Sequence, residues 1–157
     1  MGFAPSKLAL TSTAFQHLGR IPRQHTGEGE DVSPPLAWTN VPQGTRSFAL
    51  VCHDPDAPLV KPGTYGFVHW VLYGIPASVT RLEQGERGYT AGVNDMGNRS
   101  YNGPMPPEGH GTHHYYFHVY ALDAPVDAGP GLRREELLDR IDDHIIEQAR
   151  MVGTFSR

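Results

Sequence analysis

The chain has 157 residues, enough for one domain with a substantial core, and its formal net charge is −4. This acidic balance argues against a protein that coats nucleic acid and against a polybasic membrane anchor. A single cysteine, Cys52, excludes an internal disulfide framework and favours a reducing compartment. We therefore expect one soluble, cytoplasmic domain over residues 1–157, without a signal peptide or an integral membrane segment.

Glycine and proline are abundant, with 18 and 14 residues, which favours turns and short strands over a helical bundle. Residues 7–15 fit a first strand, and residues 36–38 fit a short extended segment. Between them, residues 16–35 form a predicted loop. A loop of this length without secondary structure is uncommon inside a compact domain, and such a loop usually has a function or packs against the rest of the protein.

Two later stretches have the composition of strands that are covered on both faces. Residues 47–53 run from Phe48 to Cys52 without polar alternation, and residues 65–74 are similarly apolar. The prolines of Asp54–Pro58, which follow the first of these strands, impose a fixed turn.

The next part of the chain alternates between loop and strand. Residues 77–83 fit one helical turn, and residues 84–111 fit a loop that is repeatedly interrupted by glycine. Residues 112–122 are aromatic and β-branched, which is typical of a strand.

One helix is predicted, from Leu132 to Val152, with Gly153 as its stop. Its apolar residues recur at a spacing of three to four and would form one buried stripe. The stripe comprises Leu137, Leu138, Ile141, Ile145, Ala149 and Val152. Short strands separated by turns, followed by one helix, predict a mainly β fold: an antiparallel β-sandwich with a C-terminal α-helix.

In a strand, successive side chains point to opposite faces of the sheet. In each of three predicted strands, one face therefore combines apolar residues with one or two polar residues near an end. We expect these three faces to meet in one core, with Asp54, His69, His113 and Tyr115 at its rim. The three sets are Phe48, Leu50, Cys52 and Asp54; Phe67, His69, Val71 and Tyr73; and His113, Tyr115, Phe117 and Val119.

Such a rim would form a small cavity that suits an anion. A carboxylate beside imidazoles favours their protonated form and decides which ring nitrogen donates. Backbone N–H groups of the glycine-rich loop before His113 could add further donors. The alternative is that a buried His–Asp pair has only a structural role.

A metal site is a second alternative, because four histidines lie close together in the sequence. They are His110, His113, His114 and His118. On a strand, His114 and His118 would lie ~13 Å apart at ~3.3 Å per residue, too far to share one ion. The trio Asp54, His69 and His113 could hold a metal in principle, but we predict no metal and no cofactor.

An enzyme and a pure interaction module are the remaining alternatives. No Gly-x-Ser-x-Gly motif occurs, and Cys52 lies in the middle of a strand as a core residue. Because no base can be assigned to Ser100 or Thr112, we predict no catalytic residue, although a hydrolase stays open. In an interaction module, the loop 84–111 or the helix would contact the partner, and the pocket would be vestigial.

Four motifs in order resemble the phosphatidylethanolamine-binding protein family, and most closely its bacterial Raf kinase inhibitor-like branch. They are Ser33–Trp38, Asp54–Pro58, Val68–Trp70 and Gly103–Tyr115. The resemblance spans nearly the whole chain. It implies two antiparallel sheets in a Greek-key sandwich, with a small anion-binding pocket near one end.

The resemblance also implies which residues bind the ligand and what kinds of partner to expect. Known members bind phosphate-like headgroups, and eukaryotic relatives inhibit kinases or proteases. This chain departs from the family pattern at His53 and at His25. Carried over by position, the ligand-binding residues are Asp54, Asp56, Pro58, His69, Tyr101, Gly103, His113 and Tyr115.

A homodimer is compatible with the sequence but is not required by it. The back of the strand 112–122 carries Tyr116, His118 and Tyr120, which strand alternation places on the face opposite the pocket.

Overall fold

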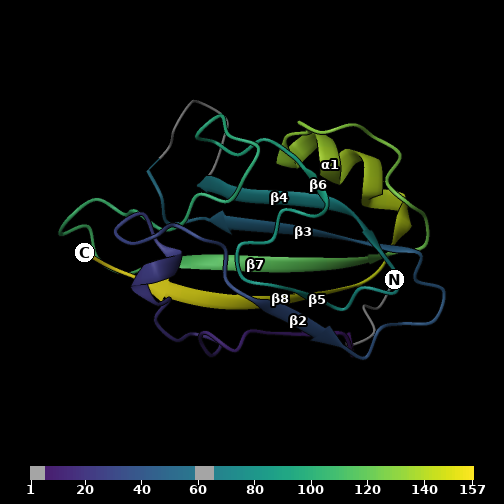
Figure 1. Cartoon of the computed structure of the whole chain (residues 1–157), viewed down its shortest axis with the longest axis horizontal. Helices are drawn as coiled ribbons and strands as arrows, with labels where there is room; N and C mark the ends of the chain where they lie inside the picture. The colour runs from purple at the N-terminus through teal and green to yellow at the C-terminus, as the bar shows by residue number, and fades with distance from the viewer. Residues whose placement is uncertain (1–5, 59–65) are drawn as a thin grey trace.

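The computed structural model describes residues 6–58 and 66–157, which form two antiparallel sheets (Figure 1). The three-stranded sheet has the order β1 (Ala9–Thr11), β2 (Leu36–Thr39) and β5 (Arg81–Leu82). The five-stranded sheet has the order β6 (Thr90–Ala91), β4 (Phe67–Pro76), β3 (Ser47–Asp54), β7 (His113–Leu122) and β8 (Ile145–Phe155).

The larger sheet has Greek-key connectivity. Strands β3, β4 and β6 are adjacent in the sheet and follow one another in the chain, apart from β5 of the smaller sheet, and β7 returns to pair with the free side of β3. The prediction of a mainly β, Greek-key antiparallel sandwich is therefore confirmed. Tyr65, the first residue of one predicted strand, lies outside the described residues, as do residues 1–5.

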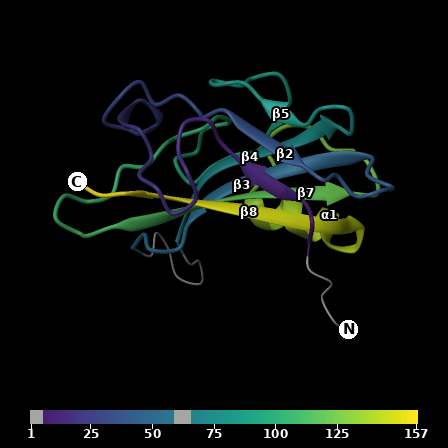
Figure 2. The ribbon, with the colours of Figure 1, turned by 90° about the horizontal axis from the view of Figure 1, so that it is seen from below.

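The main core lies between the two sheets. Trp38 of β2 packs edge-on against Phe48 of β3, with ring centroids 5.2 Å apart. A second cluster covers the other face of the five-stranded sheet, where Leu137 and Ile141 of α1 (Arg134–Ile141) pack with Val51 and Tyr73. Figure 2 shows α1 on the opposite side of that sheet from β2 and β5. This coverage explains the continuous apolar runs of β3 and β4, because both faces of these strands are buried.

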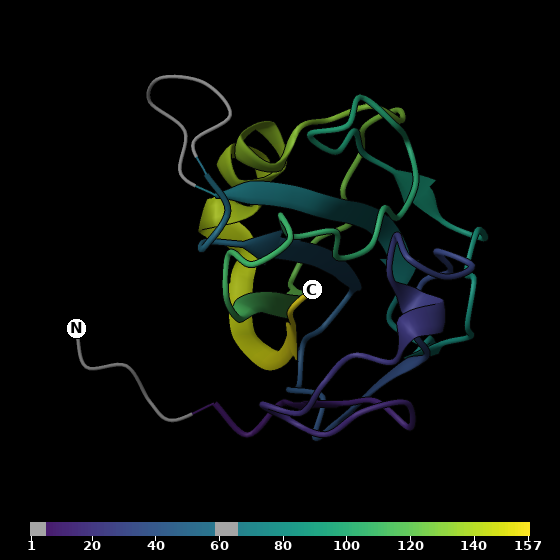
Figure 3. The same ribbon diagram turned by 90° about the vertical axis from the view of Figure 1, so that its left-hand side faces the viewer.

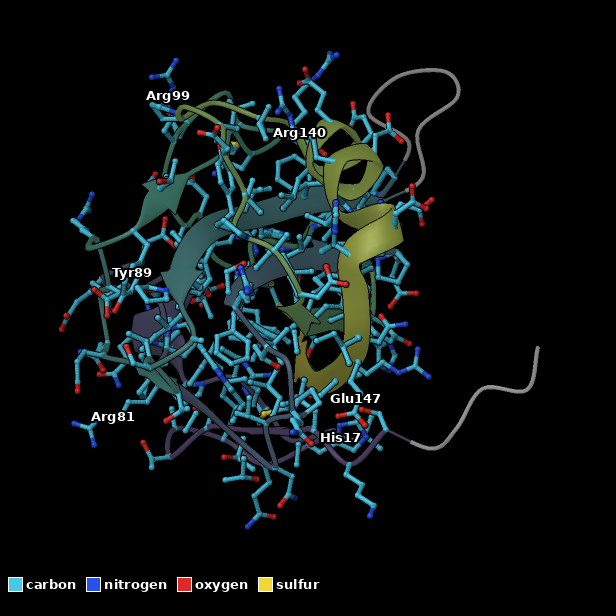
Figure 4. The ribbon with its side chains drawn as sticks, turned by 90° about the vertical axis from the view of Figure 1, so that its right-hand side faces the viewer. His17, Arg81, Tyr89, Arg99, Arg140 and Glu147 are labelled. Atoms are coloured by element: carbon cyan, nitrogen blue, oxygen red, sulfur yellow. The ribbon has the colours of Figure 1, made fainter. Side chains whose placement is uncertain are left out.

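The predicted helix from Leu132 to Val152 is wrong over its second half. The helix ends at Ile141, a 3₁₀ turn spans Asp142–His144, and β8 begins at Ile145. Figure 4 shows Arg140 on the helix and Glu147 on the strand. From Ile145 to Arg150 the burial alternates with period two, because β8 is the edge strand that pairs antiparallel with β7. The C-terminal helix is thus followed by a strand.

Gly153 is part of β8 and does not end a helix. A Cβ atom at this position would collide with Ile21 and with the ring of Phe15, which pack over the strand. The glycine is needed for this close approach of the N-terminal segment to β8.

The prediction that Phe67, His69, Val71 and Tyr73 share a face holds only for the first two residues. Cys52 pairs with Trp70, whereas His53 pairs with Val68, so His69 is the extra residue of a β-bulge. The bulge shifts the alternation by one residue. Consequently Trp70 and Leu72 enter the main core, while Val71 and Tyr73 face α1.

Smaller differences concern the short elements. The predicted helical turn over residues 77–83 is a turn followed by β5, and the predicted loop 84–111 contains β6. A 3₁₀ turn, Arg23–His25, interrupts the loop 16–35. No helix of the described residues is long and apolar enough to cross a membrane.

Candidate functional site

A cavity of about 520 Å³ opens at the end of the sandwich where β3 ends and β4 and β7 begin. Figure 3 views this end, which also carries the loop 103–112 beside the C-terminal residues. The walls are largely apolar, with Phe67, Met96, Met105, Pro106 and Pro107 among the lining residues. Polar side chains reach the cavity from Asp31, Asp54, His69, Asn102, His113 and Tyr115.

A buried ion pair, Asp54 with His113, joins the end of β3 to the start of β7. His113 Nδ1 lies 2.7 Å from Asp54 Oδ2, and the two side chains are only 2% and 3% exposed. The other carboxylate oxygen of Asp54 accepts a hydrogen bond from the backbone N–H of Asp56 at 2.8 Å. Both partners are therefore held in one orientation. A carboxylate oxygen can only accept here, so Nδ1 of His113 carries a proton and donates to Asp54.

His69 enters the cavity from the bulge of β4. Its Nδ1 donates to the backbone carbonyl of Asn102 at 2.6 Å, and its ring meets that of Tyr115 edge-on at 5.2 Å. Burial lowers the pKa of His69, although the Asn102 carbonyl and Asp54 act in the opposite direction. Near neutral pH the ring is thus uncharged, and its Nε2 carries a lone pair that accepts a hydrogen bond.

Tyr115 is 1% exposed and lies two residues beyond His113 on β7. Burial raises the pKa of its hydroxyl, and the negative charge of Asp54 raises it further. The phenol therefore stays protonated and can donate a hydrogen bond. The cavity thus combines an acceptor on His69 with a donor on Tyr115.

The loop 16–35 contributes a second carboxylate, Asp31. Its Oδ1 accepts from the backbone N–H of Gly103 at 2.7 Å, and its Oδ2 lies 3.4 Å from Asn102 Nδ2. A Cβ atom at Gly103 would collide with the carbonyl oxygen of His25, so only glycine allows the two loops to approach. Asp31 and Asn102 are not among the site residues predicted from the sequence. The unusual length of the loop 16–35 is the one signal that pointed toward Asp31.

Of the eight predicted site residues, six line the cavity: Asp54, Pro58, His69, Gly103, His113 and Tyr115. The other two, Asp56 and Tyr101, support it from outside. Tyr101 packs against Trp70, and its hydroxyl donates to the His25 carbonyl at 2.5 Å, which anchors the loop behind the cavity.

Asp56 pairs with His114 on the outer side of the site. It accepts from the His114 backbone N–H at 2.8 Å, and the ring Nδ1 lies 2.6 Å away. Burial acts in the opposite direction, but these hydrogen bonds lower the pKa of the Asp56 carboxyl. Asp56 thus stabilises the turn after β3 and the start of β7.

His110 is an exposed residue and was not among the predicted site residues, although it belongs to the group of four histidines considered as metal ligands. Its Nδ1 lies 2.7 Å from Nε2 of His113. Over residues 6–58 and 66–157, no three His, Cys, Asp or Glu side chains are arranged to hold a metal ion.

Cys52 is 1% exposed and belongs to the main core. Burial raises the pKa of its thiol, and the charge of Asp54 adds to the effect. A protonated, enclosed thiol of this kind is a poor nucleophile.

The two packed antiparallel sheets, with an open apolar cavity whose floor is polar, define a β-sandwich of the ligand-binding type. The sequence profile of the phosphatidylethanolamine-binding protein family matches residues 11–156, so the chain belongs to this family. The match confirms the resemblance that the four sequence motifs indicated. The similar proteins support a bacterial member of the family.

Relatives from distant organisms match over most of their length. A UPF0098 protein of Methanothermobacter thermautotrophicus is 39% identical, covering 94% of this chain and 98% of the relative. A UPF0098 protein of Aquifex aeolicus is also 39% identical, covering 93% of this chain and 86% of the relative.

Two crystal structures have closely similar folds. CT736 of Chlamydia trachomatis, described as a homolog of phosphatidylethanolamine-binding protein, superposes with a TM-score of 0.89 at 34% identity, covering 96% of this chain and 97% of that one. Escherichia coli YbcL, described as a member of the mammalian family, superposes with a TM-score of 0.88 at 29% identity, covering 97% and 99%.

Proposed function

We propose that this protein binds a small phosphorylated ligand, with the phosphoryl group at the polar floor of the cavity. The observation that supports this is the convergence of His69, His113, Tyr115 and Asp54, from three neighbouring strands, at the floor of an otherwise apolar cavity. A cavity of about 520 Å³ lies within the size range of small-molecule sites. The apolar walls exclude water and strengthen the few polar contacts.

The polarity of the floor favours one protonation state of the ligand. The monoanion of a phosphomonoester has one P–OH group and two other oxygens that only accept. The P–OH would donate to Nε2 of neutral His69, and a charged oxygen would accept from the Tyr115 hydroxyl. The dianion of a phosphomonoester lacks the donor, and its second charge would also face the carboxylates of Asp31 and Asp54. The monoanion therefore fits better.

Phosphate binding can be tested by titration calorimetry with inorganic phosphate and with phosphoethanolamine at pH 5.5 and pH 7.5. We expect weak binding of both compounds, and phosphoethanolamine should bind more tightly at pH 5.5, because a phosphomonoester loses its second proton at a pKa of about 6. His69→Ala should weaken binding at least about tenfold, because it removes the acceptor. Tyr115→Phe, which removes only the hydroxyl, should weaken it by about three- to tenfold.

The matched control is His118→Ala, which removes a histidine from the other face of β7. Its affinity for phosphate should equal that of the unmodified protein. Unchanged affinity in both His69→Ala and Tyr115→Phe would contradict the proposal. Turnover of phospho- or acyl-esters that disappears in the pocket variants would favour a hydrolase instead.

The finer expectations from the family stay predictions. They are a phospholipid headgroup as the ligand, a kinase or protease as the partner, a homodimer and a cytoplasmic location. A phosphorylated headgroup and a phosphorylated side chain share the group that the floor of the cavity would recognise. The two sources can be separated by comparing phosphoethanolamine with a phosphoserine peptide in the same titration.

A further inference from the structure

Both ring nitrogens of His113 are engaged within the protein. Nδ1 lies 2.7 Å from Asp54 Oδ2, and Nε2 lies 2.7 Å from Nδ1 of His110. The rings of His110 and His113 are tilted by 57° with centroids 4.9 Å apart. A ligand oxygen therefore has no free nitrogen on His113 while His110 stays in place.

The two contacts of His113 differ strongly in how firmly they are held. Asp54 is 2% exposed and is fixed by a second hydrogen bond from the Asp56 backbone. His110 is exposed, and within the described residues its side chain makes only the one hydrogen bond to His113. Replacing Asp54 would leave a buried imidazole unpaired, whereas His110 can exchange its bond for one to water.

The loop around His110 is anchored at its base and open at its tip. Arg157 holds the base, because its Nε donates to the Pro106 carbonyl at 2.6 Å and its own carbonyl accepts from the Gly109 N–H at 3.1 Å. Gly109 and Gly111 flank His110 with φ of 75° and 96°, and a Cβ atom at either glycine would meet nothing within 4 Å. Because the His110 side chain is itself exposed and the space beside both glycines is open, it can turn outward without displacing packed atoms.

We propose that His110 is a displaceable cap on His113, and that a phosphoryl oxygen of the ligand takes its place at Nε2. This inference rests on the proposed function and assigns to His110 the control of ligand affinity at the same site. In the free protein, the cap keeps Nε2 of the buried His113 hydrogen-bonded. Because His110 occupies this nitrogen, it also competes with the ligand.

The test compares inorganic phosphate binding by the unmodified protein, His110→Ala and the loop control Thr112→Ala. Thr112 is exposed in the same loop, and its replacement leaves the net charge unchanged. Removing the cap should tighten phosphate binding by about three- to tenfold, the equivalent of one net hydrogen bond. Thr112→Ala should bind as the unmodified protein does.

A second measurement follows the ring nitrogens of His113 by ¹⁵N NMR. In the unmodified protein, phosphate should shift the Nε2 signal of His113 and the Nδ1 signal of His110 together. In His110→Ala, the Nε2 signal should already be changed before phosphate is added. A merely structural role of His110 would alter the melting temperature without this pattern.

Each outcome separates the cap from the proposed function. Equal phosphate affinity in His110→Ala and the unmodified protein would overturn the cap and leave the proposed function standing. Weaker binding by His110→Ala would also overturn it, because His110 would then contact the ligand directly. Binding by His110→Ala alone would support the cap, and no binding by either protein would overturn both proposals.

Discussion

Two histidines on the cavity face of the five-stranded sheet and two on the opposite face have contrasting surroundings. On the cavity side, Nδ1 of His69 and Nδ1 of His113 have partners at 2.6 and 2.7 Å. On the side that faces α1, Nδ1 of His53 and Nδ1 of His118 are buried, and neither has a hydrogen-bond partner among the described residues. His113 and His118 lie on the same strand, five residues apart.

The outer pair is kept neutral by its environment. Burial lowers the pKa of both His53 and His118 to about 4, and the positive charge of Arg134 contributes to each shift. Their rings extend a row of stacked aromatics, in which His118 lies 6.1 Å from Tyr116 and 6.0 Å from Tyr120. His53 and His118, which are half-buried and whose Nδ1 atoms have no partner within the described part of the chain, therefore serve as packing residues. His69 and His113, which are buried and hydrogen-bonded, form part of the candidate site.

The largest expected effect is on the ion pair at the floor of the cavity. Asp54→Ala should lower the free energy of unfolding by about 3 kcal/mol, because it leaves the enclosed His113 without its partner. Asp56→Ala breaks the pair with His114, whose side chains are 42% and 41% exposed, and should cost less than about 1 kcal/mol. Denaturation in urea at pH 7 measures both values. Equal losses would show that burial does not distinguish the two pairs.

An intermediate effect is expected on the pH dependence of stability. A histidine in the unfolded chain has a pKa of about 6.5, so between that pH and pH 4 the unfolded state binds more protons than the folded state does at His53 and His118. Stability should therefore fall as the pH falls through this window and be unaffected above it. After reduction for partial exposure, the pair should contribute on the order of 2 kcal/mol of loss by pH 4.5.

The double variant His53→Gln/His118→Gln removes this titration, and the unmodified protein serves as the reference. Urea denaturation at pH 7.5, 6.5, 5.5 and 4.5 should show the variant losing less stability than the reference as the pH falls. Arg134 and Arg150, which face His118, are retained in both proteins. Parallel curves for the two proteins would contradict the assignment of low pKa values to the outer histidines.

The smallest effect is expected from replacing one histidine on each face of the sheet by leucine. His118→Leu should change the free energy of unfolding by less than about 1 kcal/mol in either direction, because it removes a buried Nδ1 that has no partner among the described residues. His69→Leu should cost about 1–2 kcal/mol, because it leaves the Asn102 carbonyl without its donor. Thermal and urea unfolding of the two variants give the comparison, and the opposite order would refute it.

Much of the fold could be predicted from local composition and alternation. The continuous apolar run of β3 and the aromatic, β-branched composition of β7 both predict strands, and the structure buries Phe48, Leu50, Phe117 and Val119 together in one cluster. Alternation also separates His113 from His114 correctly, because His113 lines the cavity and His114 pairs with Asp56 outside it. These successes depend only on the geometry of single strands.

The errors arise where a local pattern has two solutions. Ile141, Ile145 and Ala149 fit a helical stripe, yet the same segment also alternates, and pairing with the exposed edge of β7 favours the strand. The alternation of residue types along β4 does not predict the bulge at His69 either, because the bulge depends on the register of β4 against β3.

The sequence by itself determined the strands that contribute Asp54, His69, His113 and Tyr115, because strand composition and turn residues act over a few neighbouring positions. Only the tertiary structure decided which further groups meet them. Asp31 and His110 arrive from loops whose positions depend on contacts with Gly103 and Arg157, far away in the chain. Loop placement is a property of the assembled fold, so the composition of the site was settled by packing between distant segments.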